Sequence, residues 1–396
     1  MYPAWVYVAG IAAFWLMGSA PIFPVADSDA HGSRVEAIDG LRGLLALSVF
    51  VHHSAIYYGF VHTGVWALPP SMFYSNLGPA AVAMFFMITG FLFWSQMIKA
   101  NGRPDFLSLY VGRLFRILPT YWVLVVMLVI GTGILSHWHL RVSLAQLCRE
   151  VSVWMSGAIM TGQSINGTDA PNTISAWVTW TLHYEWIFYG SLLIIAFLAR
   201  GRAALSLPAL GIALSPVYSI AHHPFGIWTS DPDAGCIVLM FSIGMALAAL
   251  PKGKKAPQWL ASLLFTATAA IAVFGFRTVY EPVPILLLGA AFACVLRGAT
   301  VFGLLRSAPA IRLGNISYAV YLLQGPILCA VLVPARAFDR SLGVHCAMCL
   351  LACVLLIMVS ASVHAFVEKP GIAAGKRLVK RLRPASSVGR LVPEFR

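Results

Sequence analysis

Residues 78–98 read GPAAVAMFFMITGFLFWSQMI, a stretch without a single charged side chain. As a helix it would rise about 30 Å, which is the thickness of the hydrocarbon core of a bilayer. Apolar runs of about 17 to 25 residues, each long enough to cross that core, recur from one end of the chain to the other. The stretch is therefore one span among several, and the sequence predicts an all-α, polytopic membrane helical bundle.

The composition of the 396-residue chain supports this fold class. Hydrophobic residues make up 59% of the chain and charged residues 10%, whereas soluble domains average about half apolar and about a quarter charged. A single anchor on a soluble enzyme would leave most of the chain with ordinary composition. A large water-soluble domain is therefore excluded.

Apolar windows between charged residues and Pro or Gly breaks predict eleven spans. They lie near residues 5–23, 41–61, 78–98, 118–136, 176–199, 203–221, 234–250, 258–276, 282–298, 316–335 and 343–367. No positively charged residue precedes the first span, which we interpret as an extra helix with an external N-terminus. A signal peptide is the alternative interpretation.

Positive charge is divided unevenly between the two sides of this bundle. Summed over alternate loops, 22 of the 27 Lys and Arg residues fall on one side and 5 on the other. The positive-inside rule assigns the heavy side, and with it the C-terminus, to the cytoplasm. In a membrane protein the net charge of +13 marks cytoplasmic loops. The basic tail KRLVKRLR at 376–383 is expected to fix topology and contact membrane lipids, with nucleic acid binding as the alternative that we do not favour. The seven cysteines lie mostly inside apolar runs and are interpreted as packing residues, with no metal site.

The second span carries an arginine and a histidine at a helical spacing. It begins with IDGLRG, and His53 follows Arg42 by eleven residues, about three turns and about 16 Å of rise, so both share one face. A neutral imidazole is well suited to take a proton from a hydroxyl near pH 7. His53 is thus a candidate general base, although a helix-packing histidine fits equally well. His52 points about 100° away and fits packing better.

Two further segments carry candidate binding residues. Arg113 and Arg116, in a loop after the third predicted span, would present two guanidinium groups on one side, a geometry suited to phosphate oxygens. Positive-inside anchoring is the alternative for both. Glu185 is predicted to sit against aromatic rings near the external end of the bundle, which suits a sugar, whereas an ion pair with an arginine would make it structural.

Aromatic and amide side chains accompany that glutamate. Trp180 and Tyr189 lie in the same segment, WTLHYEWIFY. Near the tenth span, Tyr318, Tyr321 and Gln324 form a stripe along one helix face, for which packing is the alternative interpretation.

Together these segments resemble the acyltransferase-3 family of integral membrane acyltransferases. The matching pieces are IDGLRGLLALSVFVHH, FFMITGFLFW at 85–94, GRLFRILPTYW, WTLHYEWIFY, LGNISYAVYL and FVEKPG at 366–371. The resemblance implies a ten-span domain over residues 35–370, preceded by an extra helix and linker at 1–34 and followed by a basic cytoplasmic tail at 371–396. The family's motif of an arginine, ten residues and a histidine falls on Arg42 and His53, and its arginine pair falls on Arg113 and Arg116.

What the resemblance implies is a reaction in the bacterial inner membrane. Acyl-CoA, usually acetyl-CoA, would act as co-substrate without a further cofactor, and its acyl group would pass to a hydroxyl of a saccharide or lipid-linked saccharide. Asp39, Arg42 and His53 are then the candidate catalytic residues, and Arg113 and Arg116 would bind acyl-CoA. Acceptor-binding candidates are Trp180, Glu185, Tyr189, Tyr318, Tyr321 and Gln324.

Two questions stay open at this point. Many relatives of the family carry a fused periplasmic domain that completes the transfer, and no such segment follows residue 370 here. The resemblance then implies either direct transfer to the final acceptor or hand-over of the acyl group to a separate periplasmic transferase. The main rival function is a transporter that moves a saccharide or acyl group without chemistry, because aromatic cavities with a few polar groups also serve permeation.

Overall fold

The computed structural model describes residues 36–160, 162, 164–222, 232–251, 253, 256–335 and 342–383. Within these ranges the regular elements are helices, apart from one β-bridge between Ile165 and Thr168. The all-α class is therefore confirmed. The predicted first span and linker, and the tail from residue 384 onward, lie outside the described residues.

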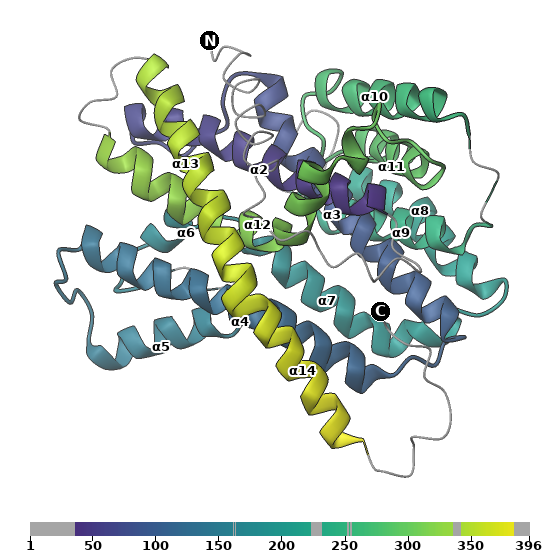
Figure 1. The fold of residues 1–396 in the computed structure, drawn as a ribbon, viewed down its shortest axis with the longest axis horizontal. Coiled ribbons are helices and arrows are strands. Elements are labelled where there is room, and N and C mark those ends of the chain that lie inside the picture. Colours follow the sequence, from purple (N-terminus) through teal and green to yellow (C-terminus); the bar gives the residue numbers. More distant parts are fainter. Residues whose placement is uncertain are drawn as a thin grey trace.

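Ten apolar helices form the body of the molecule (Figure 1). They are α2 (Glu36–Thr63), α3 (Met72–Lys99), α4 (Phe106–Leu135), α7 (Trp180–Ile195), α8 (Ala203–His222), α9 (Ala234–Ala249), α10 (Gln258–Phe274), α11 (Pro282–Leu296), α12 (Ala308–Ala335) and α13 (Leu342–Val363). The short helices α5 (Leu144–Met155) and α6 (Ala170–Ile174) follow α4, and α14 (Lys369–Leu382) continues α13 through a π-helical turn at His364–Glu368.

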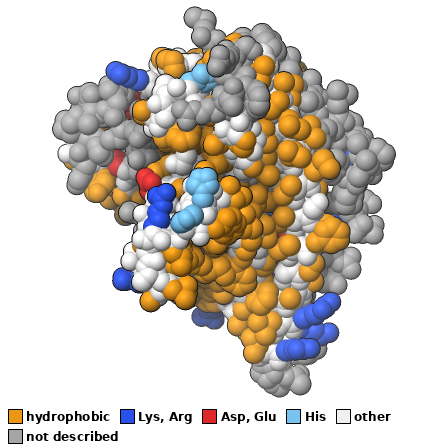
Figure 2. All heavy atoms as spheres, turned by 90° about the vertical axis from the view of Figure 1, so that its left-hand side faces the viewer, with side chains coloured by type: hydrophobic (Ala, Val, Ile, Leu, Met, Phe, Trp, Pro, Cys, Tyr) orange, Lys and Arg blue, Asp and Glu red, His pale blue; other side chains and the backbone are white. Residues whose placement is uncertain are grey.

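Each of the ten predicted spans between residues 41 and 367 overlaps one of these helices. In the part of the chain that the structure describes, seven helices are long and apolar enough to cross a bilayer, counting α13 and α14 as one. The other three, α9, α10 and α11, have 16, 17 and 15 residues, so they rise only about 23 to 26 Å. Apolar side chains cover most of the face seen in Figure 2, as expected of a surface in contact with lipid.

Helices α2 and α12 pack side by side in the centre and run in the same direction. Glycines allow the close approach, because a Cβ at Gly314 would lie 2.0 Å from the Asp39 carbonyl oxygen and a Cβ at Gly43 would lie 2.5 Å from that of Ala310. Farther along, the Tyr57 hydroxyl donates to the Gly325 carbonyl at 3.3 Å. This register fixes which residues of the two helices stand at the same level.

Helix α4 begins earlier than the sequence predicts. Its first residue is Phe106, twelve residues before the expected start at 118, because the Asp105 side chain caps the helix by accepting from the Ser108 amide at 3.1 Å. The prediction that Arg113 and Arg116 lie in a loop is therefore wrong, since both are inside the helix. We call the end of the bundle where α2, α4 and α12 begin the basic end.

The segment between α4 and α7 is more than the external loop that the sequence predicts. After α4 the chain turns back as the amphipathic helix α5, whose Met155 carbonyl accepts from the Trp122 indole at 3.1 Å. Trp122 is thirteen residues before the end of α4, about 20 Å along its axis. Helix α7 therefore starts well inside the bundle.

The glycine contact between α2 and α12 predicts that Gly314→Ala destabilises the protein by about 1–3 kcal/mol, because the new methyl group would overlap backbone atoms that cannot move independently. The thermal midpoint of the purified protein in detergent measures this. Gly59→Ala is the matched control, since a Cβ at Gly59 meets no atom within 4 Å. Equal midpoints for the two variants would contradict the close packing.

Candidate active site

A cavity of about 160 Å³ lies among α2, α3, α4, α7 and α12. Its charged and hydroxyl-bearing lining residues are Arg42, Thr89, Arg113, Arg116, Thr181, Glu185, Tyr189, Ser317, Tyr318 and Tyr321. Segments up to about 280 residues apart in the sequence thus supply one polar chamber inside an apolar bundle. Of the eleven residues that the sequence singles out, seven line it and Asp39, His53, Trp180 and Gln324 do not.

Two of the arginines are paired with carboxylates. Arg42 lies 3.7 Å from Asp39, one turn earlier on α2. Arg116 lies 3.9 Å from Glu368, whose side chain is 1% exposed. Since an unpaired charge in such a place is costly, these carboxylates allow the guanidinium groups to remain inside the bundle.

The third arginine is held by an aromatic ring and a hydroxyl. The Arg113 guanidinium carbon lies 4.5 Å from the centre of the Phe93 ring. Arg113 also lies beside Tyr189 and Glu185. The Tyr189 hydroxyl in turn donates to Glu185 Oε2 at 2.9 Å, one turn back on α7. Arg113 is therefore coupled to the glutamate through a tyrosine that faces the same cavity.

The position of Glu185 corrects the sequence prediction, which places it near the external end. The Thr89 hydroxyl donates to its Oε1 at 3.5 Å, and Thr89 stands only ten residues before Lys99, where α3 ends, about 15 Å away. Glu185 thus lies toward the basic end, together with the arginines. The reason is the returning segment around α5, which makes α7 begin deep in the bundle.

Glu368 was not among the residues singled out by the sequence. It closes the π-helical turn between α13 and α14, and one of its oxygens lies 2.9 Å from His364 Nδ1. Short π-helical segments recur at functional sites. The available signal was a lone carboxylate in FVEKPG at the end of an apolar span, a position where charge is rarely kept without use.

The tyrosines of α12 connect the walls of the cavity. The Tyr318 hydroxyl donates to the Ile117 carbonyl of α4 at 3.0 Å, while the Tyr321 hydroxyl lies 3.0 Å from Thr181 Oγ1 at the start of α7. Their rings remain as lining surface. Trp180 instead packs against the Phe86 ring, with centroids 6.2 Å apart, outside the lining.

His53 stands beyond the far end of the cavity and not in its wall. The register of α2 and α12 places it level with Gln324, about one turn past Tyr321, and the two side chains lie beside each other. Among the described residues, His53 Nδ1 and Gln324 Oε1 are buried without a hydrogen-bond partner. A buried polar atom of this kind costs about 1–3 kcal/mol, and Thr120, Thr132 and Ser360 carry others.

His52 has the packing role that the sequence favours for it. Its Nδ1 lies 2.6 Å from the Tyr74 carbonyl oxygen, and a Cβ at Gly78 would overlap its ring. His52 therefore fastens α2 to α3, and the neighbouring His53 is the histidine left with an unsatisfied nitrogen.

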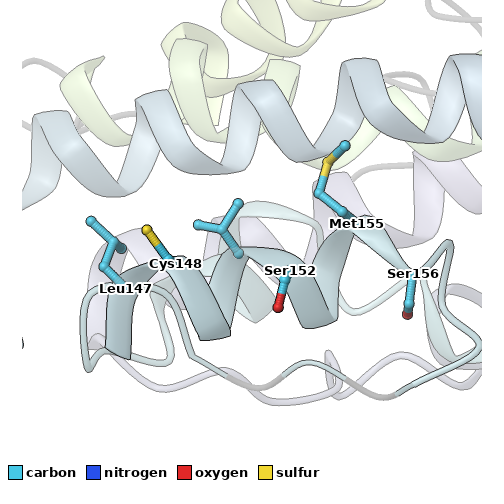
Figure 3. A pocket seen from close by; sticks show the side chains of 6 residues that line it. Leu147, Cys148, Ser152, Met155 and Ser156 are labelled. Atoms are coloured by element: carbon cyan, nitrogen blue, oxygen red, sulfur yellow. The ribbon is translucent and has the colours of Figure 1, made fainter. Parts of the chain in front are cut away.

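A second, open hollow lies along α5 and has a different character. Its lining is Leu147, Cys148, Val151, Ser152, Met155 and Ser156 (Figure 3). It contains no charged side chain. The Arg42 cavity is thus the one of these two that can bind an anionic or strongly polar group.

The fold and this cavity define a multi-pass helical membrane protein with an internal polar site. Its family follows from comparison with known proteins: the acyltransferase-3 model, described as an acyltransferase domain, matches residues 35–362. Since the match covers most of the chain, the protein belongs to this family and is a membrane acyltransferase. No curated protein and no solved structure matched the chain.

Glu368→Gln should lower the free energy of unfolding by about 1–2 kcal/mol, because Arg116 and His364 lose a buried charged partner. The loss stays moderate because Arg116 remains partly exposed to solvent. Denaturation of the purified protein in detergent measures the change. Glu36→Gln, at the exposed start of α2, should shift stability by less than about 0.5 kcal/mol. A Glu368 variant as stable as this control would rule out the pairing.

Proposed function

We propose that this protein is an O-acyltransferase of the bacterial inner membrane, with its C-terminus in the cytoplasm. It moves an acyl group, the acetyl group in particular, from cytoplasmic acyl-CoA to a hydroxyl of a cell-envelope or exported saccharide. One observation supports the proposal most strongly. In this member of the acyltransferase-3 family, three arginines and Glu185 line the same cavity; the arginines are Arg42, Arg113 and Arg116.

The arginines support an anionic acyl donor. A guanidinium group presents several fixed donors to phosphate oxygens and keeps its charge when partly buried. The cavity of about 160 Å³ is smaller than the 300–1,000 Å³ typical of pockets for whole organic ligands. It therefore suits the thioester end and pantetheine arm of acyl-CoA, with the adjoining pyrophosphate at the arginines and the 3′-phosphorylated nucleoside outside at the basic end.

The other walls support a hydroxyl-bearing acceptor. Beside the donor there is room only for the reacting edge of a sugar, to which the rings of Tyr318, Tyr321 and Phe85 offer apolar surface. Glu185 offers carboxylate oxygens that accept hydrogen bonds from its hydroxyls. An acceptor that reaches past Tyr321 would meet the unsatisfied atoms of His53 and Gln324.

The chemistry assigned to His53 is general-base catalysis. The imidazole accepts the proton of the acceptor hydroxyl as its oxygen attacks the thioester carbonyl carbon, the carbon–sulfur bond breaks, and the CoA thiolate receives a proton. Gln324 beside it can hold the hydroxyl by accepting or donating a hydrogen bond. A route through an acyl-histidine has the same overall balance, with the acyl group passing first to the imidazole nitrogen and then to the hydroxyl.

Removal of the arginine pair tests donor binding. Arg113→Ala with Arg116→Ala should raise the KM for acetyl-CoA at least tenfold, because each charge-assisted contact contributes about 1.5–3 kcal/mol. The assay follows thiol release from acetyl-CoA by detergent-purified protein with a saccharide acceptor. Arg141→Ala with Arg149→Ala removes the same charge from the exposed surface around α5 and should leave KM unchanged. An unchanged KM in the cavity variant would assign Arg113 and Arg116 to topology alone.

Removal of the imidazole tests the base assignment. His53→Ala should lower the rate of acyl transfer by about 100-fold or more, which is the usual contribution of a positioned base, while the protein still elutes as a folded species. His62→Ala, at the exposed end of the same helix, is the control. Acylation of the acceptor at the wild-type rate without His53 would refute this role, and transport of the saccharide without consumption of thioester would favour the transporter.

A further inference from the structure

Helix α14 projects from the bundle at the basic end. Together with α13 it forms a helix of 41 residues, about 60 Å long and twice the hydrocarbon thickness. Figure 1 shows α14 leaving the body of the molecule beside the first turns of α4. The two helices stand next to the arginine end of the cavity, because Arg113 and Arg116 lie on α4 and Glu368 immediately precedes α14.

The contacts between α14 and α4 define how the pair is oriented. Gly371 and Gly375 of α14 lie against Phe115, where a Cβ at Gly375 would come within 2.8 Å of the Phe115 Cβ. At the far tip, Arg383 pairs with Asp105 at the cap of α4. The helices are therefore antiparallel, with the Gly371 and Gly375 face of α14 against the Phe115 face of α4.

Charged residues fall on the two flanks of this contact. At about 100° per residue, Lys369, Lys376 and Lys380 share one flank of α14 with Arg383, and all three lysines are exposed. On α4, Asp105 and Arg116 are eleven residues apart, about three turns, so they also lie on one flank of their helix. Because Arg383 contacts Asp105 and the helices are antiparallel, these two flanks lie on the same side of the pair.

A second basic stripe of α14 lies about 100° around the helix from the lysines, on the other side of the contact with α4 and farther from Asp105 and Arg116. It carries Arg377 and Arg381, which are exposed. The sequence from Lys369 to Arg383 contains no acidic residue. If the charge on α14 only set the topology or bound lipid, the lysines and the arginines would contribute equally. A ligand that extends from the arginine end of the cavity would instead contact only the lysine flank.

We propose that the lysine flank, formed by Lys369, Lys376 and Lys380, binds the 3′-phosphate of the nucleotide part of CoA. The inference rests on the proposed function. The cavity is too small for the whole donor, so the nucleoside with its 3′-phosphate has to lie outside it, beyond the pyrophosphate at the arginines. The lysine flank continues the positive charge of Arg113 and Arg116 outward along that path.

The test compares the binding of CoA, dephospho-CoA and pantetheine to the full-length protein in detergent by isothermal titration calorimetry. Lys376→Gln with Lys380→Gln should weaken CoA binding about three- to tenfold, as expected for two solvent-exposed charge contacts. Pantetheine, which has no phosphate, should bind as it does to the wild type. Arg377→Gln with Arg381→Gln removes the same charge from the second basic stripe and should leave CoA affinity unchanged.

Each other outcome overturns the inference. Equal weakening by both double variants would assign α14 to a general electrostatic effect, and equal weakening for pantetheine would mean a disturbed cavity. Unchanged CoA affinity with reduced attachment to vesicles of phosphatidylglycerol would assign the lysines to lipid. If the wild type binds no CoA at all, the proposed function itself is refuted. That result is distinct from one in which the wild type binds CoA and the lysine variant binds it equally well, which refutes only the role of the lysines.

Discussion

The structure depends on keeping guanidinium groups inside an apolar bundle. Charge in the hydrocarbon region is costly unless it is paired or faces a polar chamber. Arg42 pairs with Asp39, one turn away on the same helix. Arg116 pairs with Glu368 from the π-helical turn after α13, and Arg113 lies beside Glu185 of α7. The three guanidinium groups and Glu185 line one chamber, while Asp39 and Glu368 pair with Arg42 and Arg116 without lining it.

Two features of helix packing bring that chamber into existence. The glycine contact of α2 with α12 sets the level of Arg42 against the tyrosines and of His53 against Gln324. The returning segment after α4 lets α7 begin deep, which carries Glu185 to the arginines. As a result, the arginines, Glu185 and the tyrosines occupy one continuous space, and the imidazole stands about one turn past its end.

Much of this was predictable because membranes constrain sequences strongly. The apolar runs gave the all-α class and the approximate places of ten helices, and the spacing of Arg42 and His53 put both on one face of α2. The start of α4 and the depth of Glu185 were not predictable in the same way. They depend on a cap at Asp105 and on a helix, α5, that is too short and too amphipathic to register as a span. Glu368 was missed because its importance lies in a contact with Arg116, some 250 residues earlier in the chain.

The central claim is that the arginine cavity receives the reactive end of acyl-CoA and presents it toward His53. A cryo-electron microscopy structure with a non-hydrolysable thioether analogue of acetyl-CoA tests this most directly. The account predicts that the pantetheine arm lies between Arg42, Glu185 and Tyr321, with the acetyl carbon pointing toward His53 and Gln324. Analogue density elsewhere, with Arg42 and Arg116 still held by Asp39 and Glu368 and the cavity unfilled, would contradict it.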